Sequence, residues 1–104
     1  MKVIWKEPAT RRLIGIYRFV AENSPSAALR IYDEIIDRAD QLADHPEMAS
    51  RELSLEGEPE DFRSLVVDGT YKVIYYIESE AVNIIDVWDC RQSPSRLRRG
   101  LLKK

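Results

Sequence analysis

The chain has 104 residues, of which 44% are hydrophobic and 33% are charged, and its formal net charge is −2. This composition is typical of a soluble globular protein and excludes a disordered tail. No apolar run approaches the roughly 18–20 residues that a membrane-spanning helix needs. The single cysteine, Cys90, excludes an internal disulfide and the single histidine excludes the usual zinc sites, so we expect neither a metal nor a cofactor.

A chain of this length holds one modest hydrophobic core, and we therefore expect residues 1–104 to form a single domain. The N-terminal segment MKVIWKEPATRR does not have the apolar core of a signal peptide, because charges interrupt it. A lone cysteine suits a reducing compartment. We expect a cytoplasmic protein that does not bind membranes.

Two amphipathic helices follow a short N-terminal strand, Met1–Trp5. Apolar residues at helical spacing predict a first helix that ends near Glu22. Ser24 and Pro25 then supply the cap and the first position of a second helix, which continues to Ala43. Because the connection between the helices is very short, we predict an antiparallel helical hairpin.

The first helix has a wider apolar face than contact with one sheet requires. Leu13 and Val20 belong to its core face, and Ile14, Tyr17 and Ala21 extend that face to one side. This wider stripe either belongs to the core or forms a docking groove for a partner protein.

Strand patterns dominate the second half of the chain. β-Branched and aromatic residues predict strands over Phe62–Val67, Tyr71–Glu78 and Ala81–Asp89. Asp68–Gly69 is a two-residue hairpin turn between the first two of these strands. The last two strands have apolar residues on both faces, which indicates central strands of a sheet. Arg51–Leu55 is a weaker candidate for an edge strand.

Ser93–Pro94 repeats the start signal of the second helix and predicts a short final helix, Ser95–Leu102. No repeat or low-complexity segment interrupts the order of elements. This order predicts an α+β fold, in which the N-terminal strand and the antiparallel helical hairpin pack on a small, mostly antiparallel sheet followed by a short C-terminal helix.

Charge is unevenly distributed along the chain. Residues 1–18 carry five bases and one acid, residues 91–104 carry six bases and no acid, and the stretch between residues 30 and 61 is strongly acidic. These are either ordinary solvated surfaces or a dipolar surface whose basic end meets an acidic partner or a phosphate backbone. A negative net charge is unusual for a protein that binds DNA non-specifically.

Three short motifs, together with the order of elements, resemble a known family. They are R-x-L-x-V in Arg63–Val67, Y-K-V-I-Y in Tyr71–Tyr75 and V-W-D-x-R-Q-x-P in Val87–Pro94. Together with the helical front of the chain, they resemble the RelE/ParE superfamily of type II toxin–antitoxin toxins, the plasmid stabilization group. The resemblance covers nearly the whole chain, and the motifs are specific only in this order and spacing.

The resemblance implies one of two activities, and the fold alone does not choose between them. RelE-like toxins cut messenger RNA in the ribosomal A site, whereas ParE-like toxins trap DNA gyrase on cleaved DNA and catalyse no bond chemistry of their own. In either case the resemblance implies a hetero-oligomer with a cognate antitoxin. A further alternative is a non-toxic regulatory module that only binds its antitoxin and operator.

RNA cleavage needs a base for the ribose 2′-hydroxyl, an acid for the leaving oxygen and cations for the phosphate. The resemblance implies that Arg63, Lys72 and Arg91 would clamp that phosphate in a ribonuclease. Leu65 and Leu97 stand where the ribonuclease pattern has a second lysine and a late tyrosine. Because a clamp without an acid or a base is a poor nuclease, we assign no catalytic residue and favour the ParE-like activity.

The resemblance also implies two binding surfaces. The predicted target-binding residues surround the exit of the last strand and comprise Arg63, Lys72, Trp88, Asp89, Arg91 and Arg96. The predicted antitoxin-binding residues follow the wider stripe of the first helix and comprise Ile14, Tyr17, Arg18 and Ala21. The leading hypothesis is a ParE-like toxin that inhibits DNA gyrase, and the alternative is an endoribonuclease that acts with the ribosome on messenger RNA.

Overall fold

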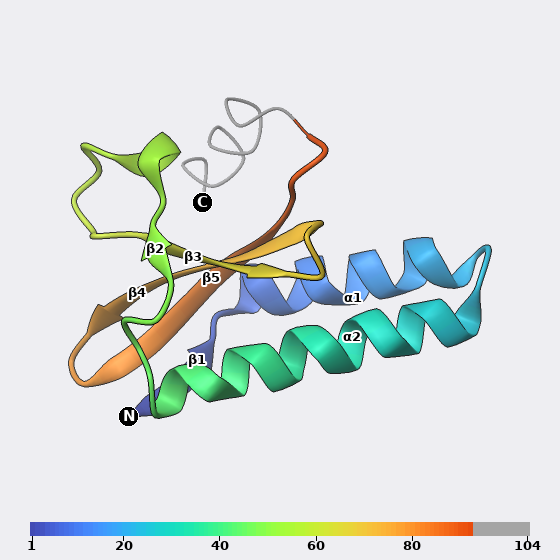
Figure 1. Ribbon diagram of the computed structural model, residues 1–104, viewed down its shortest axis with the longest axis horizontal. Coiled ribbons are helices and arrows are strands. Elements are labelled where there is room, and N and C mark those ends of the chain that lie inside the picture. The colour runs from blue at the N-terminus through green and yellow to red at the C-terminus, as the bar shows by residue number, and fades with distance from the viewer. Residues whose placement is uncertain (93–104) are drawn as a thin grey trace.

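The computed structural model describes residues 1–92, and Figure 1 shows how their elements are arranged. The elements in chain order, with η for a short 3₁₀ helix, are β1 (Lys2–Trp5), α1 (Glu7–Ala21), α2 (Pro25–Asp40), η1 (Gln41–Ala43), β2 (Ser50–Arg51), η2 (Leu53–Leu55), β3 (Arg63–Val67), β4 (Tyr71–Glu78) and β5 (Ala81–Asp89). The predicted final helix, Ser95–Leu102, and Arg96 lie outside the described residues.

The helical hairpin forms where its capping signals place it. The Oγ of Ser24 accepts a hydrogen bond of 3.2 Å from the backbone N–H of Ala27, and Pro25 begins α2. The two helices run antiparallel and lie side by side (Figure 1), as predicted. No helix in the described part of the chain is long and apolar enough to cross a membrane.

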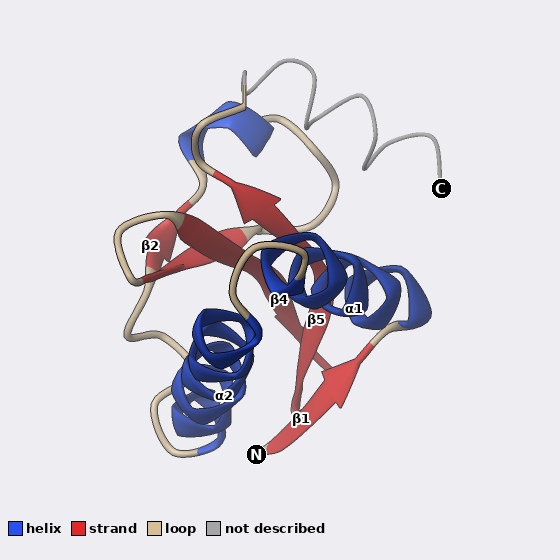
Figure 2. Ribbon diagram, turned by 90° about the vertical axis from the view of Figure 1, so that its right-hand side faces the viewer, coloured by secondary structure: helices blue, strands red, loops and turns tan. Residues whose placement is uncertain are grey.

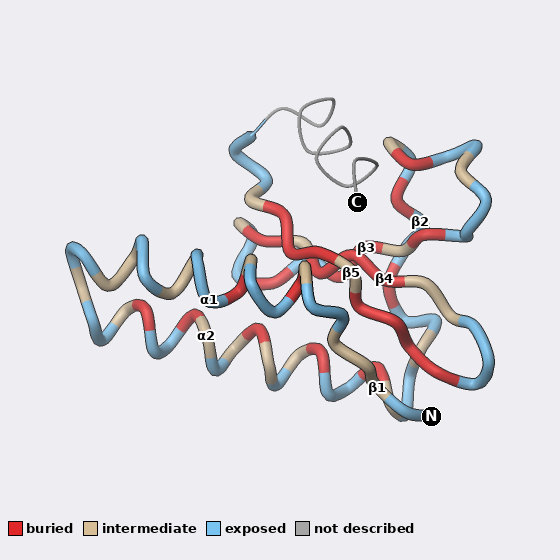
Figure 3. The backbone as a smooth tube through the Cα atoms, turned by 180° about the vertical axis from the view of Figure 1, so that it is seen from behind, coloured by how far each residue is buried: buried red, intermediate tan, exposed pale blue. Residues whose placement is uncertain are grey.

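The strands form one mixed sheet in the order β1-β5-β4-β3-β2. β1 runs parallel to β5, and the other neighbouring pairs are antiparallel. The predicted α+β fold with a mostly antiparallel sheet is therefore confirmed. β4 and β5 have their predicted bounds and lie inside the sheet, where most of their residues are buried (Figure 3).

The two faces of the sheet carry separate hydrophobic clusters. The helical hairpin covers one face, which we call the helix-side face (Figure 2), and its cluster includes Leu13, Ile35, Val73, Tyr75 and Val87. The segment between β2 and β3, which contains η2, covers the other face, which we call the loop-side face. The smaller cluster there consists of the buried residues Leu55, Phe62, Ile74 and Trp88.

The edge strand is shorter than predicted. Only Ser50–Arg51 pairs with β3, and Leu53–Leu55 forms a 3₁₀ turn instead of continuing the predicted Arg51–Leu55 strand. The cause is Glu52, because its carboxylate accepts hydrogen bonds from the backbone N–H and the hydroxyl of Ser54 at 3.2 and 2.6 Å. This local bonding turns the chain away from the sheet.

Two tight turns connect the antiparallel strands β3, β4 and β5. Asp68 and Gly69 have φ angles of 54° and 63°, and Ser79 and Glu80 have φ angles of 55° and 57°. Two successive residues with positive φ are typical of a type I′ hairpin turn, which favours Asp-Gly. Ser79 and Glu80 adopt the same backbone with side chains that disfavour it.

Candidate functional site

Arg63 and Lys72, which were predicted to clamp a phosphate together, lie on opposite faces of the sheet. In the strand register, Arg63 is opposite Tyr75 and Lys72 is opposite Trp88. Directly opposed residues share a face, and Tyr75 belongs to the helix-side cluster whereas Trp88 belongs to the loop-side cluster. The structure does not bring Arg63 and Lys72 together, because Lys72 and Tyr75 are an odd number of positions apart and side chains alternate along a strand.

Arg63 is bound to the segment that follows the helical hairpin. Its Nη1 donates a hydrogen bond of 2.7 Å to the carbonyl oxygen of Ala49, and its Nη2 lies 3.6 Å from a carboxylate oxygen of Glu47. Only 20% of the Arg63 side chain is exposed. Arg63 therefore anchors a loop and offers little surface to a target.

Lys72 is bound to Glu52 on the loop-side face. Its Nζ donates a hydrogen bond of 2.8 Å to Glu52 Oε1, and Glu52 is buried. Desolvation by burial would raise the pKa of Glu52, but hydrogen bonds from Lys72, Ser54 and Ser64 outweigh it and lower the pKa to about 2. Glu52 is ionised at neutral pH, and the charge of Lys72 is balanced inside the protein.

Arg91 and Asp89 form an ion pair at the exit of β5. The Nη2 and Nε atoms of Arg91 donate to the two carboxylate oxygens of Asp89 at 2.7 and 2.9 Å, and the Arg91 backbone N–H also donates to Asp89. The side-chain hydrogen bond from Arg91 lowers the pKa of Asp89. Because 67% of its side chain is exposed, Arg91 is more accessible than Arg63 or Lys72.

The groups beside these cations are poorly suited to transfer a proton. Burial raises the pKa of the phenols of Tyr71, Tyr75 and Tyr76, and such a phenol is a poor base at neutral pH. Glu52 and Asp89 have lowered pKa values, so neither carboxyl group holds a proton to donate. Among the described residues, these groups do not form an acid–base pair suited to RNA cleavage.

Cysteine and metal chemistry have little support in the described structure. Burial raises the pKa of the Cys90 thiol, so the reactive thiolate is scarce at neutral pH. Within residues 1–92, no group of three His, Cys, Asp or Glu residues is placed to hold a metal ion.

Trp88, one of the predicted target-binding residues, lies in the core. It is 2% exposed, and its indole N–H donates a hydrogen bond of 3.3 Å to Asp86 Oδ2. Asp86 is fully buried, accepts a hydrogen bond from the Val87 backbone N–H and lies 3.4 Å from Arg12 Nε. This ion pair, which joins α1 to β5, could not be predicted from the sequence, because no local pattern links residues so far apart in the chain.

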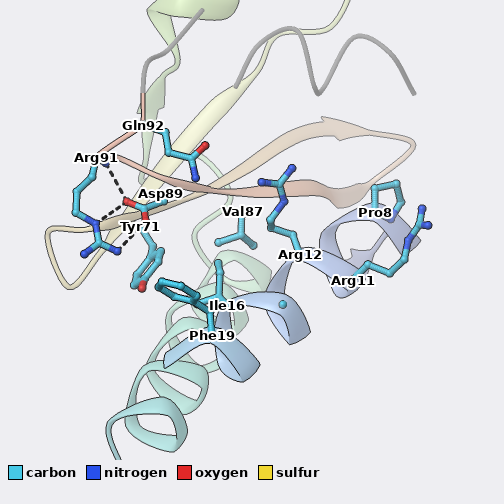
Figure 4. A pocket seen from close by; sticks show the side chains of 11 residues that line it. Pro8, Arg11, Arg12, Ile16, Phe19, Tyr71, Val87, Asp89, Arg91 and Gln92 are labelled. Atoms are coloured by element: carbon cyan, nitrogen blue, oxygen red, sulfur yellow. Dashed lines mark hydrogen bonds and ion pairs between the residues drawn. The ribbon is translucent and has the colours of Figure 1, made fainter. Parts of the chain in front are cut away.

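A cavity of about 770 Å³ lies between α1 and the exit of β5 (Figure 4), and we call it the α1–β5 groove. Its apolar surface comes from three elements and includes Ile16, Phe19, Tyr71 and Val87. Phe19 is 66% exposed, which is unusual for an aromatic residue inside a helix. The groove was not predicted, although Phe19 on the polar side of α1 was a signal in the sequence.

Charged side chains surround this apolar surface. Arg11 and Arg12 of α1 and the Asp89–Arg91 pair of the strand exit line the α1–β5 groove, and Figure 4 shows the guanidinium of Arg12 above Val87. Asp89 and Arg91 are two of the predicted target-binding residues. The structure therefore brings part of that predicted set next to α1.

A second, smaller cavity of about 270 Å³ lies on the outer surface between α1 and α2, and we call it the hairpin groove. It is lined by Ile14 and Tyr17 of α1 and by Leu29 and Tyr32 of α2. The rings of Tyr17 and Tyr32 meet edge to face, with centroids 5.9 Å apart. Ile14 and Leu29 are 40% and 54% exposed, so the groove has an open apolar surface.

Two of the predicted antitoxin-binding residues, Ile14 and Tyr17, line the hairpin groove. Arg18 is exposed and Ala21 is half-buried on the same helix. Leu29 was not predicted as a binding residue, and it lies outside the buried face of α2. An apolar residue at such a position was the available signal, and only the packing of the two helices shows that it faces α1.

Comparison with known families and structures connects this geometry to a family. Residues 3–94 match the family described as the ParE toxin of type II toxin–antitoxin systems, parDE. Among solved structures, a chain of the chromosomal ParDE toxin–antitoxin system from P. aeruginosa has the same fold, with a TM-score of 0.69 and 20% sequence identity. That match covers 86% of this chain and 95% of the other chain. No curated protein gives a significant match.

The family match spans both halves of the molecule, from β1 through the helical hairpin to the strand exit. It therefore includes the α1–β5 groove and the hairpin groove. The likeness to the P. aeruginosa structure shows the fold, and the family match carries the assignment. The chain belongs to the ParE toxin family of parDE type II toxin–antitoxin systems, within the RelE/ParE superfamily.

Proposed function

We propose that the chain is the toxin of a toxin–antitoxin pair, that it inhibits DNA gyrase, and that a cognate antitoxin neutralises it in a hetero-oligomer. The observation that carries this proposal is the family match over residues 3–94. Gyrase is the target that the ParE-like resemblance implies. Because gyrase acts on cytoplasmic DNA, the proposed place of action is the cytoplasm.

The arrangement of charged groups supports an inhibitor rather than a nuclease. Arg63 and Lys72 point to opposite faces of the sheet, and each is bound to a carboxylate of the same chain. A phosphate clamp requires converging cations, and RNA cleavage also requires a base and an acid. Neither requirement has support among the described residues, so the ribonuclease alternative gains nothing from the structure.

The hairpin groove is the proposed contact for the antitoxin. Its lining is apolar or aromatic and comes from α1 and α2, and these two helices run antiparallel (Figure 1). An amphipathic helix can bury apolar side chains in such a groove. Burial of Ile14 and Leu29, which are both exposed in the free chain, would add apolar area to this interface.

A supercoiling assay tests the target. Purified protein is incubated with gyrase, relaxed plasmid and ATP, and the products are resolved with and without protein denaturation. We expect loss of supercoiling together with trapped double-strand breaks, and we expect the cognate antitoxin to reverse both effects. Glu34→Gln serves as a control, because the Arg30–Glu34 pair of α2 is exposed and Glu34 is not among the predicted target-binding residues.

Three results would contradict the proposal in different ways. Unimpeded supercoiling without trapped breaks would exclude gyrase as the target. Codon-phased cuts in translated messenger RNA, lost in Arg91→Ala with the fold intact, would favour the ribonuclease alternative instead. Induced cells that continue to grow would indicate a non-toxic, regulatory module.

A further inference from the structure

We propose that the α1–β5 groove is the surface that binds the protein target, and that its occupant is an acidic segment of gyrase with an apolar anchor side chain. The hairpin groove is then left to the antitoxin. This inference rests on the proposed function, because it assigns one groove to each of the two partners.

Gly15 is the first observation behind this assignment. It lies in the middle of α1 and lines the α1–β5 groove, where a glycine costs a helix about 1 kcal/mol relative to alanine. A Cβ atom added at Gly15 would meet no atom of the chain within 4 Å. Nothing within the described fold requires a glycine there. A partner backbone that approaches α1 closely would require a glycine at this position, because a Cβ atom would keep the partner backbone away.

The apolar surface of the groove is the second observation. Phe19 is 66% exposed and lies beside Tyr71, Ile16 and Val87 on the same cavity. Figure 4 shows the rings of Phe19 and Tyr71 near each other at one end of the groove. Apolar anchors inserted into such pockets supply much of the binding energy of protein interfaces. An aliphatic or aromatic side chain of the partner fits this position.

Charge supplies the third observation and sets the chemistry of the partner. Arg11, Arg12 and Arg91 line the groove together with Asp89. Arg12 and Arg91 are bound to buried or groove-lining carboxylates, but Arg11 is 70% exposed and lies 3.8 Å from Glu7, which is itself 81% exposed. Gln92 also lines the groove. An acidic segment complements this surface.

A protein segment fits the groove better than a nucleic acid backbone does. Arg12 and Arg91 are already bound to Asp86 and Asp89 at 3.4 and 2.7 Å, so the groove does not offer the row of cations that a nucleic acid backbone needs. A single carboxylate can bind Arg11, whose side chain is 70% exposed. The apolar surface would gain nothing from a phosphate backbone. A carboxylate beside an apolar side chain uses both the guanidinium groups and the apolar surface.

The two grooves differ in a way that assigns them to different partners. The hairpin groove is lined by four apolar or aromatic residues, and long-lived interfaces are the more apolar ones. The α1–β5 groove mixes apolar and charged residues, as interfaces of partners that also exist apart do. We therefore assign the hairpin groove to the long-lived complex with the antitoxin and the α1–β5 groove to the shorter-lived complex with the target.

The test compares Gly15→Ala and Phe19→Ala with Asp37→Ala. Asp37 is exposed on α2, and its replacement by alanine also favours the helix, so it is a matched control. Each variant is assayed for inhibition of gyrase supercoiling, for affinity to the cognate antitoxin and for its thermal midpoint. A single-stranded DNA oligonucleotide and an excess of the same chain are tested as competing ligands.

We expect Gly15→Ala to raise the thermal midpoint and yet to raise the concentration needed for half-inhibition of gyrase by about tenfold or more. Phe19→Ala should show a similar loss of inhibition with an unchanged fold, since its ring is mostly exposed. Both variants should bind the antitoxin as the wild type does. Asp37→Ala, which also favours the helix, should keep its inhibition, so a loss in Gly15→Ala would not come from added helix stability alone.

Several outcomes would overturn the assignment. Inhibition that both variants retain would exclude the α1–β5 groove as the target surface and leave the proposed function intact. If the variants bind the antitoxin more weakly but still inhibit gyrase, the α1–β5 groove binds the antitoxin and not the target. Binding of the oligonucleotide or of a second copy that the variants abolish would give it to those ligands. A wild-type protein that does not inhibit gyrase would overturn the proposed function itself, and this assignment with it.

Discussion

Two buried carboxylates hold other parts of the chain to the sheet. Glu52 binds Lys72 and Ser54 and fixes the segment between β2 and β3 on the loop-side face. Asp86 binds the indole of Trp88 and the guanidinium of Arg12, and it joins β5 to α1. A buried carboxylate without its partners is strongly destabilising, so both residues should be sensitive to substitution.

Glu52 should make stability depend on acidic pH. Its pKa in the folded protein is about 2, below its ordinary value of 4.5. The ionised carboxylate therefore contributes stability above pH 4.5, and this contribution is lost as the pH falls from 4.5 towards 2. We expect it to amount to about 2–3 kcal/mol in urea unfolding measured across this window.

Glu52→Gln should remove this part of the pH dependence and lower the unfolding free energy at neutral pH. Asp61→Asn is the control, because the Arg51–Asp61 pair is exposed on both sides and should contribute less than about 1 kcal/mol. A Glu52→Gln profile that keeps the wild-type slope between pH 4.5 and 2 would show that another group is responsible.

Asp86→Asn should lower the unfolding free energy by about 2–4 kcal/mol, because it leaves Arg12 without its carboxylate partner and disturbs donors buried at β5. Chemical denaturation at neutral pH measures the loss. Glu34→Gln, which breaks the exposed Arg30–Glu34 pair of α2, should change stability by less than about 0.5 kcal/mol. Equal effects of the two substitutions would contradict the structural role of Asp86.

At the scale of elements, local signals predicted helices and strands well. Ser24 and Pro25 begin α2 as expected, and β4 and β5 have the predicted bounds. Local signals did less well for the segment before β3. The short β2 strand and the turn after it depend on the buried Glu52 carboxylate, whose partner Lys72 lies twenty positions away in the chain.

A substitution in the turn between β4 and β5 should raise the stability of the fold. Ser79 and Glu80 have positive φ angles, which cost a residue with a side chain about 1 kcal/mol. Glu80→Gly should therefore raise the unfolding free energy by about 0.5–1 kcal/mol. Thermal and urea unfolding measure the gain.

Gly69 provides the reciprocal control, because its φ of 63° already suits glycine. Gly69→Ala should lower stability by about 1 kcal/mol, although a Cβ there would meet no atom within 4 Å. A stabilising Gly69→Ala would mean that backbone strain is not what distinguishes the two turns.

At the scale of the whole molecule, α1 borders both the hairpin groove, which is apolar, and the α1–β5 groove, which mixes apolar and charged residues. The hairpin groove meets α2, and the α1–β5 groove meets the strand exit. Because the two grooves have different lining residues, a substitution in one groove should weaken binding of one partner and leave binding of the other unchanged.

Leu29→Lys should weaken binding of the cognate antitoxin by about tenfold or more while leaving gyrase inhibition unchanged, because it places a charge in the hairpin groove. Leu29 is 54% exposed, so the free protein should remain folded. Isothermal titration calorimetry and the supercoiling assay measure the two properties. Leu53→Lys on the exposed η2 turn is the control, and loss of inhibition in Leu29→Lys would contradict the separation.

The sequence by itself determined the order and bounds of most elements and the family resemblance. These depend on periodicity, caps and turn residues, which act over a few neighbouring positions. The sequence also indicated the candidate cations Arg63, Lys72 and Arg91. It did not indicate which residues would contact them.

Only the tertiary structure decided which residues come together. Strand register separates Arg63 from Lys72, and the packing of the β2–β3 segment gives Lys72 a buried carboxylate partner. The packing of α1 against β5 joins Arg12 to Asp86 and leaves Gly15 and Phe19 beside an open groove. The physical reason is that register, ion pairing and grooves depend on contacts between residues far apart in the chain, on which local sequence patterns do not act.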